Sequence, residues 1–230
     1  MELVDKLSNR QYIDGEWVES SNKNTRDIIN PYNQETIFTV AEGTKEDVER
    51  AILAARRSFE DGEWSLETSE VRGKKVRAVA DKIKENREEL AKLETLDTGK
   101  TLEESYADMD DIHNVFMYFA GLADKDGGEI INSPIPNAES KVVKEPVGVV
   151  TQITPWNYPL LQASWKIAPA LATGCSLVMK PSEITPLTTI RVFELMEEVG
   201  FPKGTINLVL GAGSEVGDVM SGHEEVDLVS

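Results

Sequence analysis

The sequence predicts an α/β protein in which helices and short extended pairs precede a parallel sheet of the Rossmann type. Two observations indicate this class. From Val147 onward, short β-branched and apolar runs alternate with helical segments, which is typical of a doubly wound sheet. Between residues 44 and 123, apolar residues recur at helical spacing. The 230 residues, 40% of them hydrophobic, are enough for one large domain or one and a half.

Composition excludes several classes of partner. The net charge of −17 argues against nucleic acid and against an anionic membrane surface. No apolar run suits a signal peptide or a membrane span, so we expect no membrane association. Cys175 is the one cysteine, which rules out an internal disulfide and favours a reducing, cytoplasmic location. His113 and His223 lie far apart without neighbouring cysteines, so we expect no transition-metal site.

Two extended pairs are expected at the N-terminal end. The first is a hairpin around Asp14 and Gly15, a dipeptide typical of two-residue turns. The second flanks residues 30–33, with Ile28 and Ile29 before the turn and residues 36–40 after it.

Four helices should follow these pairs. The first begins at Thr44, which with Asp47 three residues later has the spacing of a capping box. The expected positions of the others are residues 69–85, 87–98 and 102–123, with Gly99 ending the third helix. The predicted apolar face of the last helix consists of Leu102, Tyr106, Met109, His113, Phe116 and Ala120. We interpret this face, His113 included, as core packing.

Glycines and prolines interrupt the helical pattern between residues 124 and 140, which indicates a loop or a domain seam. Residues 140–145 then read as a strand, less apolar than the strands that follow.

A strand–helix–strand unit comes next. Residues 147–153 and 176–180 are buried strands, and a helix at about residues 160–172 joins them and ends at Gly174. Pro169 should kink or divide that helix. Such a unit has parallel strands and a right-handed crossover, and ligands bind beyond the carboxyl ends of its strands.

The alternation continues to the end of the chain. The expected elements are a helix at 186–199, a strand at 205–210, a helix at 214–221 and a strand at 226–229. Thr185 is expected to cap the first of these helices. Four strands separated by three helices therefore form the parallel sheet.

Polar residues gather where the first two strands of the sheet end. The Asn157 amide could be aimed at an oxyanion without adding charge, or could form an Asx turn between two prolines. Lys180 and Glu183 could donate to and accept from the ribose hydroxyls of a dinucleotide, or could simply be solvated beside a proline turn. The carboxyl edge of the sheet is therefore the candidate site.

A glycine-containing turn, residues 211–217, follows the third strand and opens a helix. Backbone N–H groups at such a place can receive a phosphate or a ribose. The spacing is not G-x-G-x-x-G, because Gly217 comes one residue late, so an ordinary tight turn remains the alternative.

Two motifs carry a resemblance to a known family. Residues 154–159 (TPWNYP), followed by residues 180–183 (KPSE), are similar to the NAD(P)-dependent aldehyde dehydrogenases, as are residues 165–174 between them. The resemblance extends from about Tyr12 to Ser230, with the betaine-aldehyde dehydrogenases as the most similar subfamily. It implies an oxidoreductase that acts on a small aldehyde, betaine aldehyde, to give glycine betaine with NAD as acceptor.

The resemblance also implies roles for individual residues. Asn157 would stabilise the oxyanion, and Lys166 would have a supporting, charge-relay role, with a helix lysine that merely reaches solvent as the alternative. The implied cofactor-binding residues are Ile153, Thr154, Pro155, Trp156, Lys180, Pro181, Ser182, Glu183, Gly213 and Gly217. The Glu183 carboxylate beside the ribose favours NAD over NADP. For Trp156 the alternative is ordinary packing at a strand end.

A monovalent cation, K⁺ or Na⁺, is a further implication of the resemblance. The matching positions are Ile28, Ile29, Asp97 and Ile184. Main-chain carbonyls with one carboxylate suit a hard cation. The alternative for Asp97 is an ordinary residue at a helix end.

Members of the family are much longer, so we expect an N-terminal piece of a truncated chain. Residues 1–136 would be hairpins and helices of the cofactor-binding domain, 137–146 a strand of an oligomerisation arm, and 147–230 the Rossmann-type NAD-binding portion. The nucleophile and the general base would lie beyond Ser230, so Cys175 is expected to be a small buried residue. The whole protein would be a homo-oligomer, and this piece alone would be inactive.

Two other interpretations stay open from the sequence. One is a non-catalytic dinucleotide-binding or interaction fragment, and the other is a semialdehyde dehydrogenase of the same superfamily. By the resemblance, most of the residues that would select the substrate lie beyond residue 230.

Overall fold

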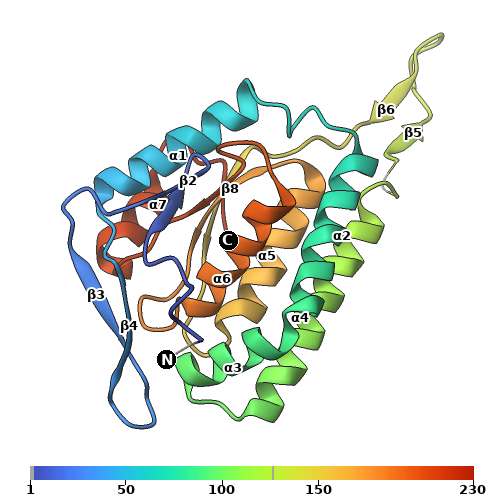
Figure 1. The fold of residues 1–230 in the computed structure, drawn as a ribbon. Helices are drawn as coiled ribbons and strands as arrows, with labels where there is room; N and C mark the ends of the chain where they lie inside the picture. The colour runs from blue at the N-terminus through green and yellow to red at the C-terminus, as the bar shows by residue number, and fades with distance from the viewer. Residues whose placement is uncertain (1–2, 126) are drawn as a thin grey trace.

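A central sheet organises the fold (Figure 1). The computed structural model describes residues 3–125 and 127–230, and within these ranges the sheet has six strands in the order β10-β7-β8-β9-β1-β2. Neighbouring strands are parallel from β10 to β9. The parallel strands are β7 (Val149–Ile153), β8 (Ser176–Lys180), β9 (Ile206–Leu208) and β10 (Leu228–Val229). The predicted α/β class is confirmed.

Helices cover both faces of this sheet. Successive residues of a strand point to opposite faces, and the apolar residues divide accordingly. Val150, Leu177 and Met179 belong to one apolar cluster, with α5 (Pro159–Thr173) and α6 (Leu187–Val199). Val149 and Val178 belong to another, with α1 (Lys45–Glu60) and α7 (Asp218–Gly222). The sheet is therefore the middle layer of three.

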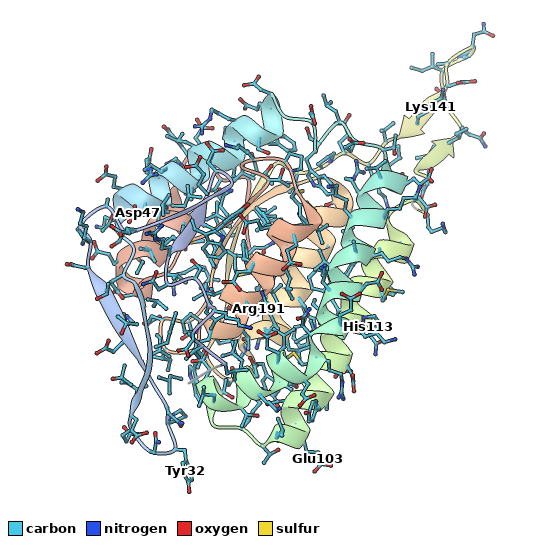
Figure 2. All side chains as sticks on the ribbon, viewed as in Figure 1. Tyr32, Asp47, Glu103, His113, Lys141 and Arg191 are labelled. Carbon is cyan, nitrogen blue, oxygen red and sulfur yellow. The ribbon has the colours of Figure 1, made fainter. Side chains whose placement is uncertain are left out.

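The other helices form a bundle outside α5 and α6 (Figure 1). Their bounds are α2 (Ser69–Glu85), α3 (Arg87–Thr98) and α4 (Leu102–Leu122). The predicted positions of all three are confirmed. On α4, however, Leu102 is exposed rather than part of the core, because it lies in the first turn, and Ile112 is fully buried instead. His113 is half-buried, and its Nδ1 lies 3.0 Å from the carbonyl oxygen of Ala80 on α2 (Figure 2).

The first N-terminal hairpin extends the central sheet. β1 (Gln11–Ile13) and β2 (Glu16–Val18) flank Asp14 and Gly15, whose φ values of 54° and 80° fit the predicted two-residue turn. β1 also pairs antiparallel with β9, a contact that the sequence did not predict. The second pair, β3 (Thr25–Ile29) and β4 (Thr36–Ala41), is a separate two-stranded ribbon.

Helix ends follow the sequence signals, with one exception. Thr44 and Asp47 form the predicted capping box of α1, and Gly99 and Gly174 end their helices in left-handed conformation, with φ values of 78° and 94°. The predicted cap of α6 by Thr185 is wrong, because the Thr185 hydroxyl donates to the Trp156 carbonyl instead.

Pro169 lies inside α5 and does not divide it, so the second of the two outcomes expected from the sequence, a divided helix, is not found. Gln152 Nε2 donates to the carbonyl of Lys166 at 2.9 Å, in the turn before the proline. The carbonyl that Pro169 leaves without a helical donor is that of Trp165, the residue before Lys166.

The segment expected to be a loop, residues 124–140, contains a strand. β5 (Glu129–Ile131) pairs antiparallel with β6 (Ser140–Val142), and the two form a ribbon that extends away from the body (Figure 1). The strand predicted at 140–145 is therefore shorter, and its partner lies in the same chain. β5 has only three residues between glycines and a proline-containing stretch, so its sequence signal is weak. In the part of the chain that the structure describes, no helix is long and apolar enough to cross a membrane.

Candidate functional site

The ends of three parallel strands meet at the carboxyl edge of the sheet. Ile153 on β7 is paired with Lys180 on β8, and the Thr154 N–H donates to the Lys180 carbonyl at 3.1 Å. On the other side of β7, the Ile153 N–H donates to the carbonyl of Ser230, next to β10, at 2.9 Å. Because β8 and β10 flank β7 on opposite sides, the chain order reverses here. Such a switch point is where open α/β sheets bind ligands.

Lys180 and Glu183 form a partly buried ion pair at this edge. The Lys180 side chain is 2% exposed, and its Nζ donates to the Pro181 carbonyl at 2.9 Å and lies 3.4 Å from Glu183 Oε2. Burial lowers the pKa of Lys180, and the Glu183 charge opposes this shift. Burial tends to raise the pKa of Glu183, but backbone N–H groups and Lys180 bring it below its ordinary value. The two groups therefore lie side by side, and each shifts the pKa of the other toward its charged form.

The glycine turn lies against the same pair. The predicted helix at 214–221 is instead a π-helical turn, η1 (Gly213–Gly217), followed by α7. The Gly213 N–H donates to the Glu183 carboxylate, which contributes to the lowered pKa of Glu183. A Cβ atom added to Gly217 would lie 3.9 Å from Ile153 Cδ1 and 4.0 Å from Lys180 Cε, whereas one added to Gly213 would meet no atom within 4 Å. Gly213 thus faces open space beside the ion pair.

The segment after β7 has one unsatisfied polar group. Thr154 is buried, and its Oγ1 has no hydrogen-bond partner among the described residues. A buried hydroxyl without a partner is costly, so a ligand that hydrogen-bonds with it would be stabilised. Trp156 is exposed, and its carbonyl accepts the hydrogen bond from Thr185. Pro181 and Ser182, which follow β8, are buried.

Asn157 follows β7 and is exposed. Within the described ranges, no residue hydrogen-bonds with its side chain. The Asx turn considered from the sequence is not formed, because Pro159, two residues later, has no N–H to donate. The amide is therefore free to donate to a ligand.

Lys166 points toward the same edge from α5. Its Nζ donates to Ser230 Oγ at 3.2 Å, and Ser230 is also the residue whose carbonyl accepts from Ile153. Burial lowers the pKa of Lys166. The lysine therefore contacts the end of β10 and does not simply extend into solvent.

Of the four residues implied for a cation, Asp97 is the most informative. Its side chain is fully buried, and its Oδ2 accepts from the Leu187 N–H at 2.8 Å, whereas Oδ1 has no partner among the described residues. Burial raises the pKa of Asp97 well above its usual range. Ile28 is buried, and Ile29 and Ile184 are exposed. In residues 3–125 and 127–230, no group of three or more His, Cys, Asp or Glu side chains is arranged to hold a metal.

Sequence reasoning missed two features near this edge. One is the Arg26–Glu42 ion pair of the β3–β4 ribbon, in which Glu42 Oε1 also accepts from the Ala212 N–H at 3.1 Å. The other is a groove of about 510 Å³ between α4 and α5. Its lining residues are Asp111, Asn114, Val115, Tyr118, Phe119, Leu161 and Trp165. Neither has a local sequence signal, because each joins segments that are far apart in the chain.

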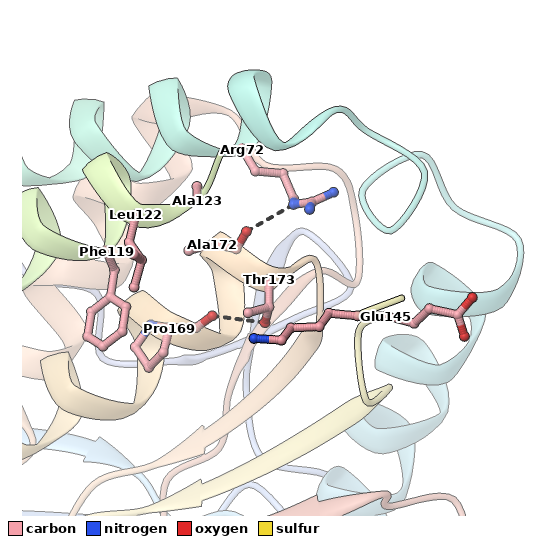
Figure 3. A pocket seen from close by; sticks show the side chains of 9 residues that line it. Arg72, Phe119, Leu122, Ala123, Glu145, Pro169, Ala172 and Thr173 are labelled. Atoms are coloured by element: carbon pink, nitrogen blue, oxygen red, sulfur yellow. Dashed lines mark hydrogen bonds between the residues drawn. The ribbon is translucent and has the colours of Figure 1, made fainter. Parts of the chain in front are cut away.

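A smaller cavity of about 180 Å³ lies at the other end of α5 (Figure 3). Arg72 Nε donates to the Ala172 carbonyl at 3.0 Å, and the Thr173 hydroxyl donates to the Pro169 carbonyl at 2.9 Å. Cys175, 2% exposed, lies at this amino end of β8, as expected for a structural residue. None of the predicted site residues lines this cavity.

Comparison with known proteins agrees with this geometry. The model of the "Aldehyde dehydrogenase family" matches residues 17–230, and the chain belongs to this family. A betaine aldehyde dehydrogenase of Bacillus subtilis is 65% identical over 97% of this chain and 46% of its own length. A peroxisomal aminoaldehyde dehydrogenase of Pisum sativum is 46% identical over 97% of the chain and 46% of its own length.

A solved structure is similar over the whole chain. The crystal structure of betaine aldehyde dehydrogenase from Staphylococcus aureus in complex with NAD⁺ has a TM-score of 0.99 and 90% identity. The match covers 100% of this chain and 45% of that one. The chain thus spans about half the length of the relatives it matches. The family resemblance predicted from the sequence is confirmed.

Proposed function

We propose that this chain is the NAD-binding part of an aldehyde dehydrogenase that oxidises betaine aldehyde to glycine betaine. The observation that carries the proposal is the convergence of Lys180, Glu183 and Gly213 at the switch point of the sheet. The similar Staphylococcus aureus and Bacillus subtilis proteins named above are betaine aldehyde dehydrogenases, and the former was crystallised with NAD⁺. When bound, NAD would supply the hydride acceptor.

The residues present fit the adenosine end of NAD. Two acceptors engage the Lys180 ammonium, which leaves a third N–H for a ribose hydroxyl, and Glu183 can accept from the neighbouring hydroxyl. A carboxylate here repels a 2′-phosphate, which favours NAD over NADP. Gly213 leaves room for the ligand. The other proposed cofactor contacts are Ile153, Thr154, Pro155, Trp156, Pro181, Ser182 and Gly217.

Asn157 is the proposed oxyanion donor. Its exposed amide can donate to a negative oxygen that develops on the substrate carbonyl. Lys166 would support this end of the site through its contact with Ser230. We propose that a residue other than Cys175 is the nucleophile, because Cys175 is buried at the opposite end of β8.

The groove between α4 and α5 favours a cationic aldehyde. Trp165 and Tyr118 are exposed in it, and Asp111 adds a carboxylate. Aromatic faces and a nearby negative charge are the usual receptors of quaternary ammonium groups. A semialdehyde that carries a carboxylate would be repelled by Asp111, so the semialdehyde alternative is less well supported.

Three further features belong to this proposal. Asp97, with an oxygen that lacks a partner, is proposed to hold a K⁺ or Na⁺ ion together with the main chain of Ile28, Ile29 and Ile184. The β5–β6 ribbon, with residues 137–146, is proposed to form part of an oligomerisation arm in a homo-oligomer. A cytoplasmic location would keep Cys175 reduced.

Substrate kinetics of the intact protein test the proposal. The protein should produce NADH with betaine aldehyde, and Trp165→Ala and Asp111→Asn should each raise KM for this substrate by roughly tenfold. An uncharged aldehyde of similar size is the matched control, and its KM should change much less. Equal losses for both aldehydes would contradict recognition of the positive charge. Binding of NAD without any aldehyde turnover would instead favour the non-catalytic dinucleotide-binding alternative.

A further inference from the structure

The β3–β4 ribbon brings an ion pair to the edge of the site. Arg26, on the inner side of β3 with Ile28, donates from Nε to Glu42 Oε2 at 2.5 Å and from Nη2 to Glu42 Oε1 at 2.7 Å. Both side chains are partly buried. Two parallel hydrogen bonds fix the plane of the guanidinium and occupy one of its forks.

Glu42 also holds the turn that precedes Gly213. Its Oε1 accepts from the Ala212 N–H at 3.1 Å, and the Gly43 N–H donates to the Leu210 carbonyl at 3.0 Å. A Cβ atom added to Gly43 would lie 2.2 Å from the Leu210 oxygen, so only glycine permits this approach. The ribbon is therefore fastened to residues 210–212.

The next residue connects this turn to the proposed ribose site. The Gly213 N–H donates to the Glu183 carboxylate, and Glu183 pairs with Lys180. The hydrogen bond to Glu42 raises the pKa of Arg26, burial opposes this, and the charges of Glu42 and Glu183 raise it further. The four side chains carry two positive and two negative charges, so their charges cancel.

We propose that Glu42 helps to select NAD over NADP by occupying Arg26. The inference rests on the proposed binding of NAD at Lys180 and Glu183. An arginine with free donors beside a ribose is a strong receptor for a 2′-phosphate. Glu42 engages that guanidinium and cancels its charge, so Glu183 is not the only group that disfavours NADP. Through the Ala212 N–H, Glu42 also positions the turn from which Gly213 reaches Glu183.

Glu42→Gln in the intact protein tests the inference. Glutamine keeps a side-chain oxygen for the Ala212 N–H but removes the negative charge. Calorimetry should show that the Kd of NADP falls by roughly tenfold, whereas the Kd of NAD changes much less. The fragment 2′,5′-ADP should gain affinity in the same way, and 5′-AMP should not. The double variant Arg26→Met/Glu42→Gln should lose the gain.

Glu198→Gln is the matched control. It removes the carboxylate of another partly exposed ion pair, with Lys82 at 2.6 Å, between α2 and α6. It should leave the affinities for all four ligands unchanged.

Three other results would each contradict one part of the inference. If Glu42→Gln leaves the ratio of NADP to NAD affinity unchanged, with or without a lower melting temperature, the ion pair has only a structural role and does not select the cofactor. A gain that persists in the double variant would show that Arg26 is not the phosphate receptor. Failure of the unaltered protein to bind NAD would overturn the proposed function and this inference with it.

Discussion

Lys180 shows how burial can define a site at the scale of one residue. An ammonium group that is 2% exposed must find acceptors within the protein or in a ligand. The Pro181 carbonyl and Glu183 supply two of them. The third N–H of the ammonium group can donate to a ligand hydroxyl. In a solvated lysine, water would already accept from this N–H.

Replacing either member of this pair should weaken NAD binding. We expect Lys180→Ala and Glu183→Gln each to raise the Kd of NAD by about tenfold or more, because hydrogen bonds to charged groups contribute about 1.5–3 kcal/mol. Calorimetry on the intact protein measures this. Lys203→Ala, which removes a lysine in an exposed ion pair with Glu16, is the control and should bind NAD normally. Unchanged affinity in both variants would refute the assignment.

Asn157→Ala should affect turnover rather than cofactor affinity. Loss of one donor to a developing oxyanion lowers kcat by about 10²–10³. The measurements are steady-state kinetics with betaine aldehyde and calorimetry with NAD. A variant with near-normal kcat would show that another group stabilises the oxyanion.

The positions of candidate site residues at one edge were predictable where those residues lie in one strand–helix–strand unit. Thr154 and Lys180 follow adjacent strands, and parallel pairing necessarily brings such residues to one edge. Arg26 and Glu42 were not predictable. Ala212, which Glu42 holds, lies 170 residues further along the chain, and no periodicity relates a ribbon residue to a turn so distant.

At the scale of elements, two buried carboxylates join α3 to the start of α6. Asp97 accepts from the Leu187 N–H, and Glu94 Oε2 accepts from the Thr188 hydroxyl at 2.6 Å. Pro186 precedes these residues and has no N–H, so the first free backbone donor of the helix is the Leu187 N–H, which Asp97 satisfies. Thr185 is adjacent to the helix start in the sequence, whereas Asp97 is 90 residues away from Leu187. The sequence around residue 186 therefore favoured Thr185 as the cap, and this prediction was wrong.

Glu94 makes the stability of this contact depend on pH. Burial raises its pKa to about 7, although hydrogen bonding and the Lys100 charge oppose the shift. The folded protein therefore holds a proton that the unfolded chain releases near pH 4.5, so this contribution to stability is full below that pH and is lost as pH rises to 7. Glu94→Gln, which stays neutral, should gain stability relative to the unaltered protein over this interval, by up to about 3 kcal/mol.

Melting temperatures at a series of pH values between 4 and 8 measure this difference. Glu198→Gln, an exposed carboxylate on α6, is the control and should show no such trend. A difference between Glu94→Gln and the unaltered protein that is constant with pH would mean that Glu94 stays charged in the folded state.

Element boundaries were predictable where caps and periodicity agree. The predicted ranges of α2 and α3 are confirmed, and Gly99 ends α3 as the sequence indicated. β5 was missed because three residues cannot show alternation and because its partner, β6, supplies the pairing.

At the scale of the whole molecule, the described residues include the proposed cofactor site, but no cysteine among them lies near Asn157. Within the described residues, the one cysteine lies at the amino end of β8, whereas Asn157 follows the carboxyl end of β7. The two ends of a parallel sheet are separated by the length of the strands, so Cys175 cannot reach a carbonyl held by Asn157 without unfolding. The parallel strands followed from the sequence pattern, whereas their order in the sheet and the pairing of β1 with β9 required the folded chain.

Residues 1–230 expressed alone should therefore give no steady NADH production with betaine aldehyde, and they should also associate. Ile130 on β5 is 81% exposed, Val143 just after β6 is also exposed, and Trp156 and Trp165 are exposed near the carboxyl edge. Exposed strand edges and apolar patches promote self-association. An NADH assay and light scattering on the same sample test both statements.

If the sample does turn over and Cys175→Ser abolishes the turnover, Cys175 is the nucleophile after all. Turnover that survives Cys175→Ser would show that the nucleophile lies elsewhere in residues 1–230. A monodisperse, inactive monomer would agree with the expected lack of turnover and contradict the expected self-association through exposed strand edges.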